Sequence, residues 1–451
     1  MKIIIVGCGK VGFTLTEQLN NEGHDITVID KDAKRLRSLA DSLDVMCVEG
    51  NGAVYQVQME AGITDTDLLI ATTNSDELNM LCCLIAKKAG NCHTIARIRN
   101  PEYSQEIRFI REELNLSMAI NPEQAAALEI SRLLKFPSAI KIDTFAKGRV
   151  ELMKFRIPEG SVLHNMQVHE VAAKLKCSVL ICAVERENDV VIPDGSFRME
   201  AGDKISFIAS SENATDFFNH IGIGNTTIKS AMFVGGGKIT YYLAKMLEQT
   251  KIKIKIIEQD FNRCNELSEL LPKAMIIHGD GSDQQLLMEE GIDQTEAFCS
   301  LTGFDEENIM LSLYAASVSN AKLVTKINRI AFESVIQQMN LGSIIYPKMI
   351  TAEGIVRYVR AMQNSMGSNV ETLYRIVAGK AEALEFRVEK DSPIVGKSLE
   401  NLSFKSNLLI ACINRGGKII TPRGKDTIEP GDTVIVVTTH SGLNDLKDIL
   451  K

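Results

Sequence analysis

Two glycine-rich turns in the chain have the spacing that phosphate binding requires. The first, G-C-G-K-V-G at 7–12, follows the apolar run 2–6. Gly7 would make the tight turn, Gly9 would let the backbone approach a pyrophosphate, and Gly12 would let the next helix pack close to the strand. Backbone N–H groups at the start of that helix would meet the anion. This spacing predicts dinucleotide binding.

An acidic residue stands at the distance that such a site needs. Asp30 ends the second expected strand, 18 positions after Gly12. Its carboxylate would accept hydrogen bonds from an adenosine ribose and would repel a 2′-phosphate. Asp30 therefore favours NAD over NADP, although the neighbouring cations Lys31 and Arg35 temper that preference.

The second turn, V-G-G-G-K-I-T at 234–240, allows three interpretations: a nucleotide-hydrolase phosphate loop, a dinucleotide turn, or a bend without a ligand. The hydrolase loop needs Gly-Lys followed at once by Ser or Thr, and a further glycine upstream. Ile239 and Met232 occupy those places. A dinucleotide turn fits better, with Thr240 in place of the third glycine and Glu258 as the acid.

The two turns belong to a repeat that runs through the whole chain. Residues 3–12 match 231–240, and A-T-T-N-S-D-E-L-N at 71–79 matches S-L-T-G-F-D-E-E-N 229 positions later. The string at 191–208 resembles that at 420–437. The layout is A–B–A′–B′, with a larger and a smaller domain in each half.

Each larger domain must bring these residues to the ends of parallel strands. In the first half, short apolar runs alternate with helical patterns at 11–22, 75–89 and 122–135, the last with Asn121 as N-cap. Such alternation predicts a doubly wound sheet. The expected fold class is α/β, with two Rossmann-like domains, each followed by a small α+β domain.

The smaller domains carry short β-branched runs separated by turns, and they hold no glycine-rich loop. In the first of them the runs are 150–155, 178–184, 190–192 and 204–209, with a helix over 168–176. The expected domain boundaries are 1–121 with a crossover helix to about 136, 140–225, 229–348 with a crossover helix to about 364, and 368–451.

Strand ends should supply the rest of each pocket. Thr72, Thr73 and Asn74 end strand four, and Arg97 ends strand five, where it could bind phosphate or form a local salt bridge. Asn51 follows strand three, in an ordinary turn or beside the ligand. The predicted first site is Gly7, Cys8, Gly9, Lys10, Val11, Gly12, Asp30, Lys31, Asn51, Thr72, Thr73, Asn74 and Arg97. The predicted second site is Gly235, Gly236, Gly237, Lys238, Ile239, Glu258, Asp280, Thr302 and Lys326.

The second site departs from the first at several places. Thr240 replaces the third glycine, Gly303 replaces Asn74, and Lys326 replaces Arg97. Lysine is a less directional phosphate partner than arginine. The substitutions argue against assuming the same nucleotide, or the same strength of binding, in both sites.

Composition narrows the functional classes. The chain has 451 residues, a formal net charge of −8, no Trp and only 5% aromatic residues. These values disfavour a nucleic-acid binder. The N-terminal apolar run is too short to predict a signal peptide, and no apolar run is long enough to span a membrane, so direct membrane insertion is not expected. Ten cysteines without a C-x-x-C pattern predict reduced thiols and no metal site.

An enzyme and a regulator are the main alternatives. A dehydrogenase would need a proton-transfer residue facing the nicotinamide, and no Tyr-x-x-x-Lys, Ser/His/Asp order or catalytic cysteine setting is present. Two nucleotide domains with small β-rich modules fit a ligand-sensing regulator better. The alternatives kept are an NAD-dependent oxidoreductase and a regulator of another cation transporter.

The tandem arrangement resembles the RCK/KTN family, the regulators of potassium conductance, over nearly the whole chain. The likeness rests on G-C-G-K-V-G with Asp30, T-T-N-S-D-E-x-N, A-R-I, the crossovers after Asn121 and Tyr346, and the paired P…G-D strings. It implies binding of NAD(H) and ATP/ADP, and a cytoplasmic place, peripheral on the inner face of the membrane. It implies a TrkH/TrkG-type potassium channel subunit as partner, and a homotetramer that forms a ring of eight RCK modules.

Overall fold

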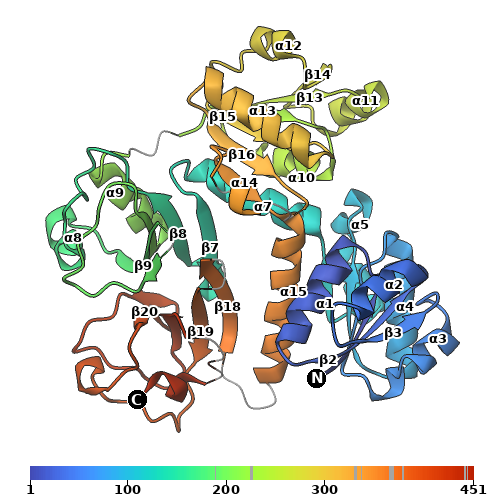
Figure 1. Ribbon diagram of the computed structural model, residues 1–451, viewed down its shortest axis with the longest axis horizontal. Coiled ribbons are helices and arrows are strands. Elements are labelled where there is room, and N and C mark those ends of the chain that lie inside the picture. Colours follow the sequence, from blue (N-terminus) through green and yellow to red (C-terminus); the bar gives the residue numbers. More distant parts are fainter. Residues whose placement is uncertain are drawn as a thin grey trace. The chain divides into compact units, whose positions relative to one another are not determined.

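The computed structural model describes residues 1–187, 189–223, 227–329, 333–336, 338–364, 370–377, 380–440, 443 and 445–451. The chain forms two compact units (Figure 1). The first unit contains Met1–Ile130 and Ser230–Val356, and the second contains Ser131–Lys229 and Arg357–Lys451. Like domains of the two halves therefore share a unit. The expected boundaries at 225 and 368 lie outside the described residues, and the four-domain division stays a prediction.

The first unit holds two copies of one α/β domain. The first copy consists of β1 (Lys2–Val6), α1 (Lys10–Asn21), β2 (Asp25–Asp30), α2 (Ala33–Ala40), β3 (Met46–Glu49), α3 (Tyr55–Glu60), β4 (Leu68–Ala71), α4 (Asp76–Ala89), β5 (His93–Arg97), α5 (Pro101–Gln105), α6 (Ile107–Glu113), β6 (Met118–Ile120) and the start of α7 (Pro122–Lys135).

The second copy repeats this order. It consists of β12 (Ser230–Val234), α10 (Lys238–Leu247), β13 (Lys253–Glu258), α11 (Phe261–Leu270), β14 (Met275–His278), α12 (Gln284–Glu289), β15 (Ala297–Ser300), α13 (Asp305–Val318), β16 (Lys322–Lys326), α14 (Glu333–Ile336), β17 (Ser343–Ile345) and the start of α15 (Pro347–Asn364).

Both sheets are parallel and have the same topology. The strand orders are β3-β2-β1-β4-β5-β6 and β14-β13-β12-β15-β16-β17. The direction of winding reverses beside β1 and β12, so the crevice outside their carboxyl ends is the place where a doubly wound fold binds its ligand. The expected pair of doubly wound domains is confirmed.

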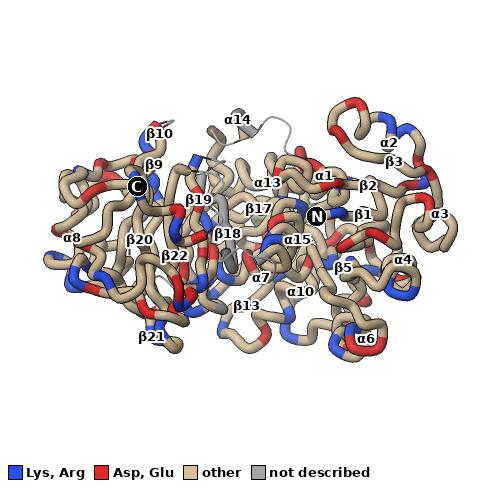
Figure 2. The backbone as a smooth tube through the Cα atoms, turned by 90° about the horizontal axis from the view of Figure 1, so that it is seen from below, with Lys and Arg blue, Asp and Glu red and all other residues tan. Residues whose placement is uncertain are grey.

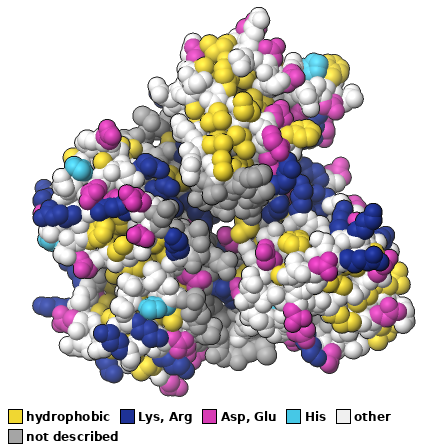
Figure 3. Space-filling view, viewed as in Figure 1, with side chains coloured by type: hydrophobic (Ala, Val, Ile, Leu, Met, Phe, Trp, Pro, Cys, Tyr) yellow, Lys and Arg dark blue, Asp and Glu magenta, His cyan; other side chains and the backbone are white. Residues whose placement is uncertain are grey.

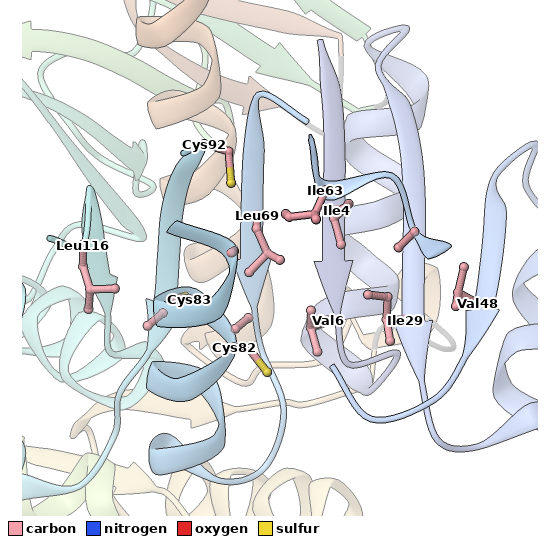
Figure 4. Packing of buried hydrophobic residues seen from close by; sticks show 14 of the residues in the cluster. Ile4, Val6, Ile29, Val48, Ile63, Leu69, Cys82, Cys83, Cys92 and Leu116 are labelled. Carbon is pink, nitrogen blue, oxygen red and sulfur yellow. The ribbon is translucent and has the colours of Figure 1, made fainter. Parts of the chain in front are cut away.

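Burial explains why these strands read as continuous apolar runs. Residues 3–6 of β1 are all buried, as in a strand that is covered on both faces. On one face Val6, Ile29 and Leu69 pack in a cluster with Cys82 of α4 (Figure 4). All ten cysteines of the chain are free thiols, and nine of them are buried.

The helices begin at residues that can cap them. Ser75 accepts a hydrogen bond from the N–H of Leu78 at the start of α4, and Asn121 accepts one from Gln124 at the start of α7. Pro122 takes the first position of α7 and has no N–H to satisfy. Helix α7 has the bounds that the sequence predicts.

The second unit contains the two small domains. Their sheets are antiparallel, in the orders β10-β9-β11-β8-β7 and β18-β19-β22-β20-β21. The elements are β7 (Lys141–Phe145), β8 (Val150–Arg156), α8 (Val168–Leu175), β9 (Leu180–Arg186), β10 (Asp189–Val191), β11 (Lys204–Ala209), α9 (Ser211–His220), β18 (Val370–Val377), β19 (Ala381–Arg387), β20 (Leu408–Arg415), β21 (Lys418–Ile420) and β22 (Thr433–Thr438).

The two small sheets share one core. Phe145 and Cys182 of the first cluster with Ala383 and Val437 of the second. Within that core the N–H of Ala146 donates to Oε1 of Glu385 at 3.1 Å. The small α+β domains of the two halves are therefore packed together as a pair.

Helix α6 carries charged residues of both signs (Figure 2), whereas the charged residues of α2 are all basic. In α6, Nε of Arg108 lies 3.0 Å from Oε1 of Glu112. Within the described part of the chain, no helix combines the length and apolar character that crossing a membrane requires.

Candidate nucleotide-binding sites

The first turn needs glycine at two positions. Gly7 has φ +100°, which L side chains rarely adopt, and its N–H donates to the carbonyl of Ile29 at 2.8 Å. A Cβ on Gly12 would lie 1.8 Å from the oxygen of Gly7, so helix α1 approaches the turn more closely than any side chain permits. A Cβ on Gly9 would meet nothing within 4 Å. The turn is therefore closed toward its own helix and open at Gly9.

Asp30 is fixed against this turn. Its Oδ2 accepts from the N–H of Cys8 at 2.5 Å, and its Oδ1 accepts from the N–H of Asp32 at 2.8 Å. One carboxylate therefore joins the glycine turn to the end of β2. The structure brings together the two elements of the predicted fingerprint.

The second turn has nearly the same backbone. Gly235 has φ +99°, and its N–H donates to Ile257 at 2.9 Å. Glu258 repeats both contacts of the first acid, with the N–H of Gly236 at 2.6 Å and that of Asp260 at 2.8 Å. The longer glutamate thus holds the same pair of donors as Asp30.

Thr240 is accommodated where the first copy requires glycine. Its hydroxyl donates to the carbonyl of Gly235 at 2.5 Å. The counterpart of this carbonyl, that of Gly7, is the atom that a Cβ at residue 12 would strike. The second copy therefore keeps the turn and gives up the closest approach of helix to turn.

The loop after the fourth strand is held by an asparagine that was not among the predicted site residues. Oδ1 of Asn79 accepts from the N–H of Thr73 at 2.8 Å, and its Nδ2 donates to the carbonyl of Arg97 at 2.9 Å. Asn308 does the same for Thr302 and Lys326, at 2.9 Å for both bonds. Each asparagine therefore ties the ends of two neighbouring strands together.

A buried aspartate extends this link in both copies. Oδ2 of Asp76 accepts from the N–H groups of Arg99 and Asn100, both at 2.7 Å. Asp305 accepts from the backbone of Asn328 and Arg329. Burial tends to raise the pKa of Asp305, but these hydrogen bonds outweigh it and lower the pKa below its usual range. The repeated S-D-E-L-N and F-D-E-E-N strings were the signal that could have found Asp76 and Asn79.

Arg97 lies inside the first site and is 7% exposed. One terminal nitrogen donates to the carbonyl of Thr73 at 2.5 Å and lies 3.4 Å from Oδ1 of Asn74. Burial, helped by the charge of Arg99, lowers the pKa of Arg97 to about 10. In the described part of the chain its Nε has no hydrogen-bond partner. Arg97 thus has donor capacity left for an anion beside the turn.

Lys326 takes the same place in the second copy. Its Nζ donates to the carbonyl of Leu301 at 3.2 Å. Burial lowers the pKa of Lys326. The negative charges of Asp305 and Glu123 oppose this shift, and the positive charge of Lys10, from the first copy, adds to it. Lys348 is similarly affected by burial and then by Lys10. A phosphate chain here would relieve the repulsion among these cations.

The remaining predicted residues divide by exposure. Val11 and Ile239 are buried, so their side chains belong to the core. Lys31 is exposed, while Oδ1 of Asn51 accepts from the N–H of Ala53 at 3.2 Å. Oδ1 of Asp280 accepts from the N–H and hydroxyl of Ser282, both at 2.8 Å, which lowers the pKa of Asp280. Lys10 and Lys238 are the first residues of α1 and α10. The hydroxyl of Thr72 lies 3.3 Å from the oxygen of Gly7.

A tyrosine joins the two copies within the first unit. The hydroxyl of Tyr242, on α10, donates to the carbonyl of Arg99 at 3.0 Å. The same oxygen accepts from Nδ2 of Asn121 at 2.9 Å and lies 2.8 Å from Oγ of Ser104. The helix that follows the second turn therefore contacts both the end of β5 and the cap of α7.

Among the described residues, no group of three or more His, Cys, Asp or Glu side chains could hold a metal ion. The polar groups at the carboxyl edges of the sheets are instead backbone N–H groups, carboxylates and single cations. That set suits the ribose and phosphates of a nucleotide.

Comparison with known proteins gives a consistent result over the whole chain. The TrkA-N domain matches residues 3–122 and 231–347, and the TrkA-C domain matches residues 152–222 and 383–451. The chain is similar to the Trk system potassium uptake protein TrkA of Haemophilus influenzae, with 34% identity over 97% of this chain and 95% of the relative. It is 30% identical to the Trk system potassium uptake protein TrkA homolog 2 of Methanosarcina mazei, over the full length of both.

Solved structures share the fold. The GsuK channel bound to NAD has a TM-score of 0.63 and 16% identity, over 97% of this chain and 76% of the channel chain. The GsuK RCK domain also gives 0.63 at 16% identity, over 97% and 92% of the two chains. The domain matches and the relatives at 30–34% identity show that the chain belongs to the TrkA family of Trk system potassium uptake proteins.

Proposed function

We propose that this protein is a cytoplasmic nucleotide-binding regulatory subunit of a Trk-type potassium uptake channel. One observation carries the proposal: two glycine turns, each closed by a carboxylate at the carboxyl edge of a doubly wound sheet. The whole-length match to potassium uptake proteins supports the transport role.

The first site binds NAD(H), with ATP/ADP as competing ligands. Asp30 receives the ribose hydroxyls, and the open backbone at Gly9 receives the phosphates. Arg97 offers its free donor to the phosphate chain. The residues proposed for this site are Gly7, Cys8, Gly9, Lys10, Val11, Gly12, Asp30, Lys31, Asn51, Thr72, Thr73, Asn74 and Arg97.

The second site binds a nucleotide with different strength. Glu258 keeps the role of the acid, while Lys326 brings a single point charge in place of a guanidinium fork. The residues proposed for it are Gly235, Gly236, Gly237, Lys238, Ile239, Glu258, Asp280, Thr302 and Lys326.

Regulation follows from the hydrogen bonds around the first site. Asn79 links the loop at Thr73 to the end of β5, and Asp76 accepts from the N–H groups of Arg99 and Asn100 just after that strand. Tyr242 continues the link to Asn121, the cap of α7. A ligand that binds Arg97 changes this network. It regulates the channel only if its affinity differs between two conformational states of the protein.

The proposed partner is a TrkH/TrkG-type potassium channel subunit in the membrane. The protein binds it from the cytoplasmic side, as a peripheral subunit without nucleic-acid binding or membrane insertion of its own. Since each chain carries two RCK modules, a homotetramer supplies a ring of eight. The protein acts on the channel by binding nucleotide and does no chemistry itself.

Isothermal titration with NADH and ATP tests the first site directly. Gly9→Glu places a carboxylate in the open space where the phosphates would lie, and Asp30→Ala removes the ribose acceptor. Both variants should lose NADH binding while the second site still takes up a nucleotide. Unchanged binding of both nucleotides in both variants would contradict the assignment.

Two further measurements separate the alternatives. An NAD-dependent oxidoreductase would consume NADH with some metabolite of a panel, whereas a regulator leaves NADH absorbance steady. Pull-down from detergent-solubilised membranes should recover a potassium channel subunit. Recovery of a different cation transporter in its place would overturn the Trk assignment.

A further inference from the structure

Helix α11 begins with an aromatic side chain that lies largely in solvent. Phe261 is 61% exposed, and its ring packs edge-on against the ring of His278, with centroids 5.4 Å apart and an interplanar angle of 72°. A phenylalanine that is exposed to this extent contributes little of the stabilisation that a fully buried one gives. The position therefore needs a reason other than core packing.

The aromatic pair adjoins the carboxylate of the second site. Glu258 ends β13, Phe261 follows three residues later, and His278 lies directly opposite Glu258 in the parallel register of β13 and β14. Nε2 of His278 lies 3.1 Å from the carbonyl of Gln259, the residue after the acid. Strand β14, which carries His278, lies on the opposite side of β13 from β12, the strand that leads into the glycine turn. The Phe261 ring contacts His278 there.

The start of α11 is anchored to the turn. Asp260 caps the helix by accepting from the N–H groups of Asn262 at 2.8 Å and Arg263 at 3.1 Å. Nε of Arg263 donates to the carbonyl of Gly236 at 2.8 Å. The position of Phe261 relative to the second turn is thus set by contacts that do not use its own ring.

The first copy has no aromatic group at these places. Ala33 begins α2, and Glu49 lies opposite Asp30 in the register of β2 and β3. The pair is therefore a property of the second copy alone, although the turn and the acid are common to both.

We propose that Phe261 and His278 form the base-binding surface of the second site, which takes a purine nucleotide whose base stacks on the Phe261 ring. This inference rests on the proposed function, since it needs Glu258 to hold a ribose. A ribose on that carboxylate, with its phosphates at the glycine turn, directs its base away from the turn, toward β14 and the start of α11. Every nucleobase offers a π-face, and a purine covers more of an exposed ring than a pyrimidine does.

The test compares a nucleotide with the same sugar phosphate lacking a base. Titrations are made in the full chain carrying Gly9→Glu, which blocks the first site, with ADP and with ribose 5-phosphate as probes. Phe261→Ala should weaken ADP binding about tenfold, as loss of one stacked base does. It should leave ribose 5-phosphate unchanged, and Phe261→Tyr should restore ADP binding.

A fluorescence measurement gives an independent readout. The chain contains no Trp, so Phe261→Trp creates a single-tryptophan protein. ADP should quench the fluorescence of this tryptophan. Adding Gly237→Glu should abolish the quenching, because it places a carboxylate at the second turn. A Cβ at Gly237 meets nothing within 4 Å, so this variant can fold. Ala33→Trp in the Gly9→Glu background is the matched control and should not respond.

The outcomes separate this proposal from the function on which it rests. Equal ADP affinity before and after the Phe261→Ala substitution overturns the stacking role while nucleotide binding stands. Equal loss of ADP and ribose 5-phosphate also overturns it, because the ring would then act on the fold of the site. A lower oligomeric mass of Phe261→Ala in light scattering identifies an assembly contact instead. If Gly237→Glu leaves ADP binding of the Gly9→Glu protein unchanged, the second site and this inference both fail.

Discussion

Position 12 and its counterpart, residue 240, differ by a side chain for which the first turn has no room. A Cβ at Gly12 would overlap the oxygen of Gly7 at 1.8 Å, yet Thr240 donates its hydroxyl to the equivalent oxygen of Gly235. The φ angles of Gly7 and Gly235 are nearly equal, at +100° and +99°. Tolerance at residue 240 therefore comes from the helix rather than from the turn.

We expect Gly12→Ala to lower the stability of the protein by about 1–3 kcal/mol, because the new methyl group meets a backbone oxygen that cannot move aside. Thermal denaturation followed by circular dichroism measures the change. Gly9→Ala is the matched control, since its Cβ meets nothing within 4 Å and Gly9 has φ −76°. Equal melting temperatures for the two variants would show that the close approach at residue 12 carries no strain.

The proposed role of Lys326 predicts that nucleotide affinity at the second site depends on pH. If the protonated form of Lys326 binds phosphate, affinity is full below its pKa and is lost as the pH rises through it. Burial lowers that pKa below the usual 10.5. Titrations of the Gly9→Glu protein at a series of pH values should therefore show ADP binding weakening at a lower pH than the loss of a proton from an ordinary lysine would give.

Lys326→Arg is the control for this pH response. The pKa of a guanidinium is higher than that of an ammonium group, so the variant should shift the decline in ADP affinity to higher pH. A decline over the same pH range in Lys326→Arg would assign the titration to another group.

At the scale of elements, the sequence was informative where a strand is buried on both faces or a helix has a strong cap. The run 2–6 and the helix that begins at Pro122 were predicted closely. Strand β7 was not expected, because K-I-D-T-F mixes charged and apolar residues without a long apolar run. Helix α9 was missed because S-E-N-A-T-D is poor in strong helix formers, and its buried Phe217 and Phe218 stabilise it through packing.

The polar contacts of the site were predictable only in part. Asp30 and Glu258 stand at a fixed spacing from a motif, so the sequence predicted them as acids of the two sites. Asn79 bonds to the backbone of Arg97, 18 residues away, and Asp76 to Arg99 and Asn100. Such long-range bonds to backbone groups leave no periodic pattern within one copy, and only the repeat of S-D-E-L-N as F-D-E-E-N points to these residues.

The hydroxyl of Tyr242 should stabilise the contact between α10 and the start of α7. Tyr242→Phe removes a hydroxyl that bonds to Asn121, Ser104 and the carbonyl of Arg99. We expect a loss of about 1–3 kcal/mol in stability, because these partly buried partners then lose their hydrogen bonds to the hydroxyl. Tyr241→Phe on the same helix is the control, since no hydrogen bond of its hydroxyl is seen among the described residues.

The same substitution tests the link between the sites. If Tyr242 couples the second turn to the cap of α7, Tyr242→Phe should change the effect of ADP on NADH affinity, and Tyr241→Phe should not. Reduced stability with unchanged coupling would leave Tyr242 a purely structural contact.

At the scale of the whole molecule, like domains pair with like. The sequence predicted the order A–B–A′–B′, but not that both larger domains would fall in one unit and both smaller domains in the other. The contacts responsible join distant residues, such as Asn121 to Tyr242 and Ala146 to Glu385. A repeat shows that two segments fold alike, but it does not show that they pack on each other.

The surface of α13 carries apolar side chains that are relevant to how chains assemble. Hydrophobic side chains gather over this helix in Figure 3. Met310 is 66% exposed, and its counterpart Leu81 on α4 is 46% exposed, so both copies carry a large apolar side chain at the same helical position. Exposed apolar groups that recur in both copies fit a repeated contact between chains in the proposed ring.

We expect Met310→Glu and Leu81→Glu each to lower the mass of the proposed tetramer in light scattering, since a buried unpaired carboxylate weakens such an interface. Val162→Glu, at an exposed apolar residue of a small domain, should leave the mass unchanged. If the mass is unchanged by both helix substitutions, the contacts between chains lie on surfaces other than α4 and α13.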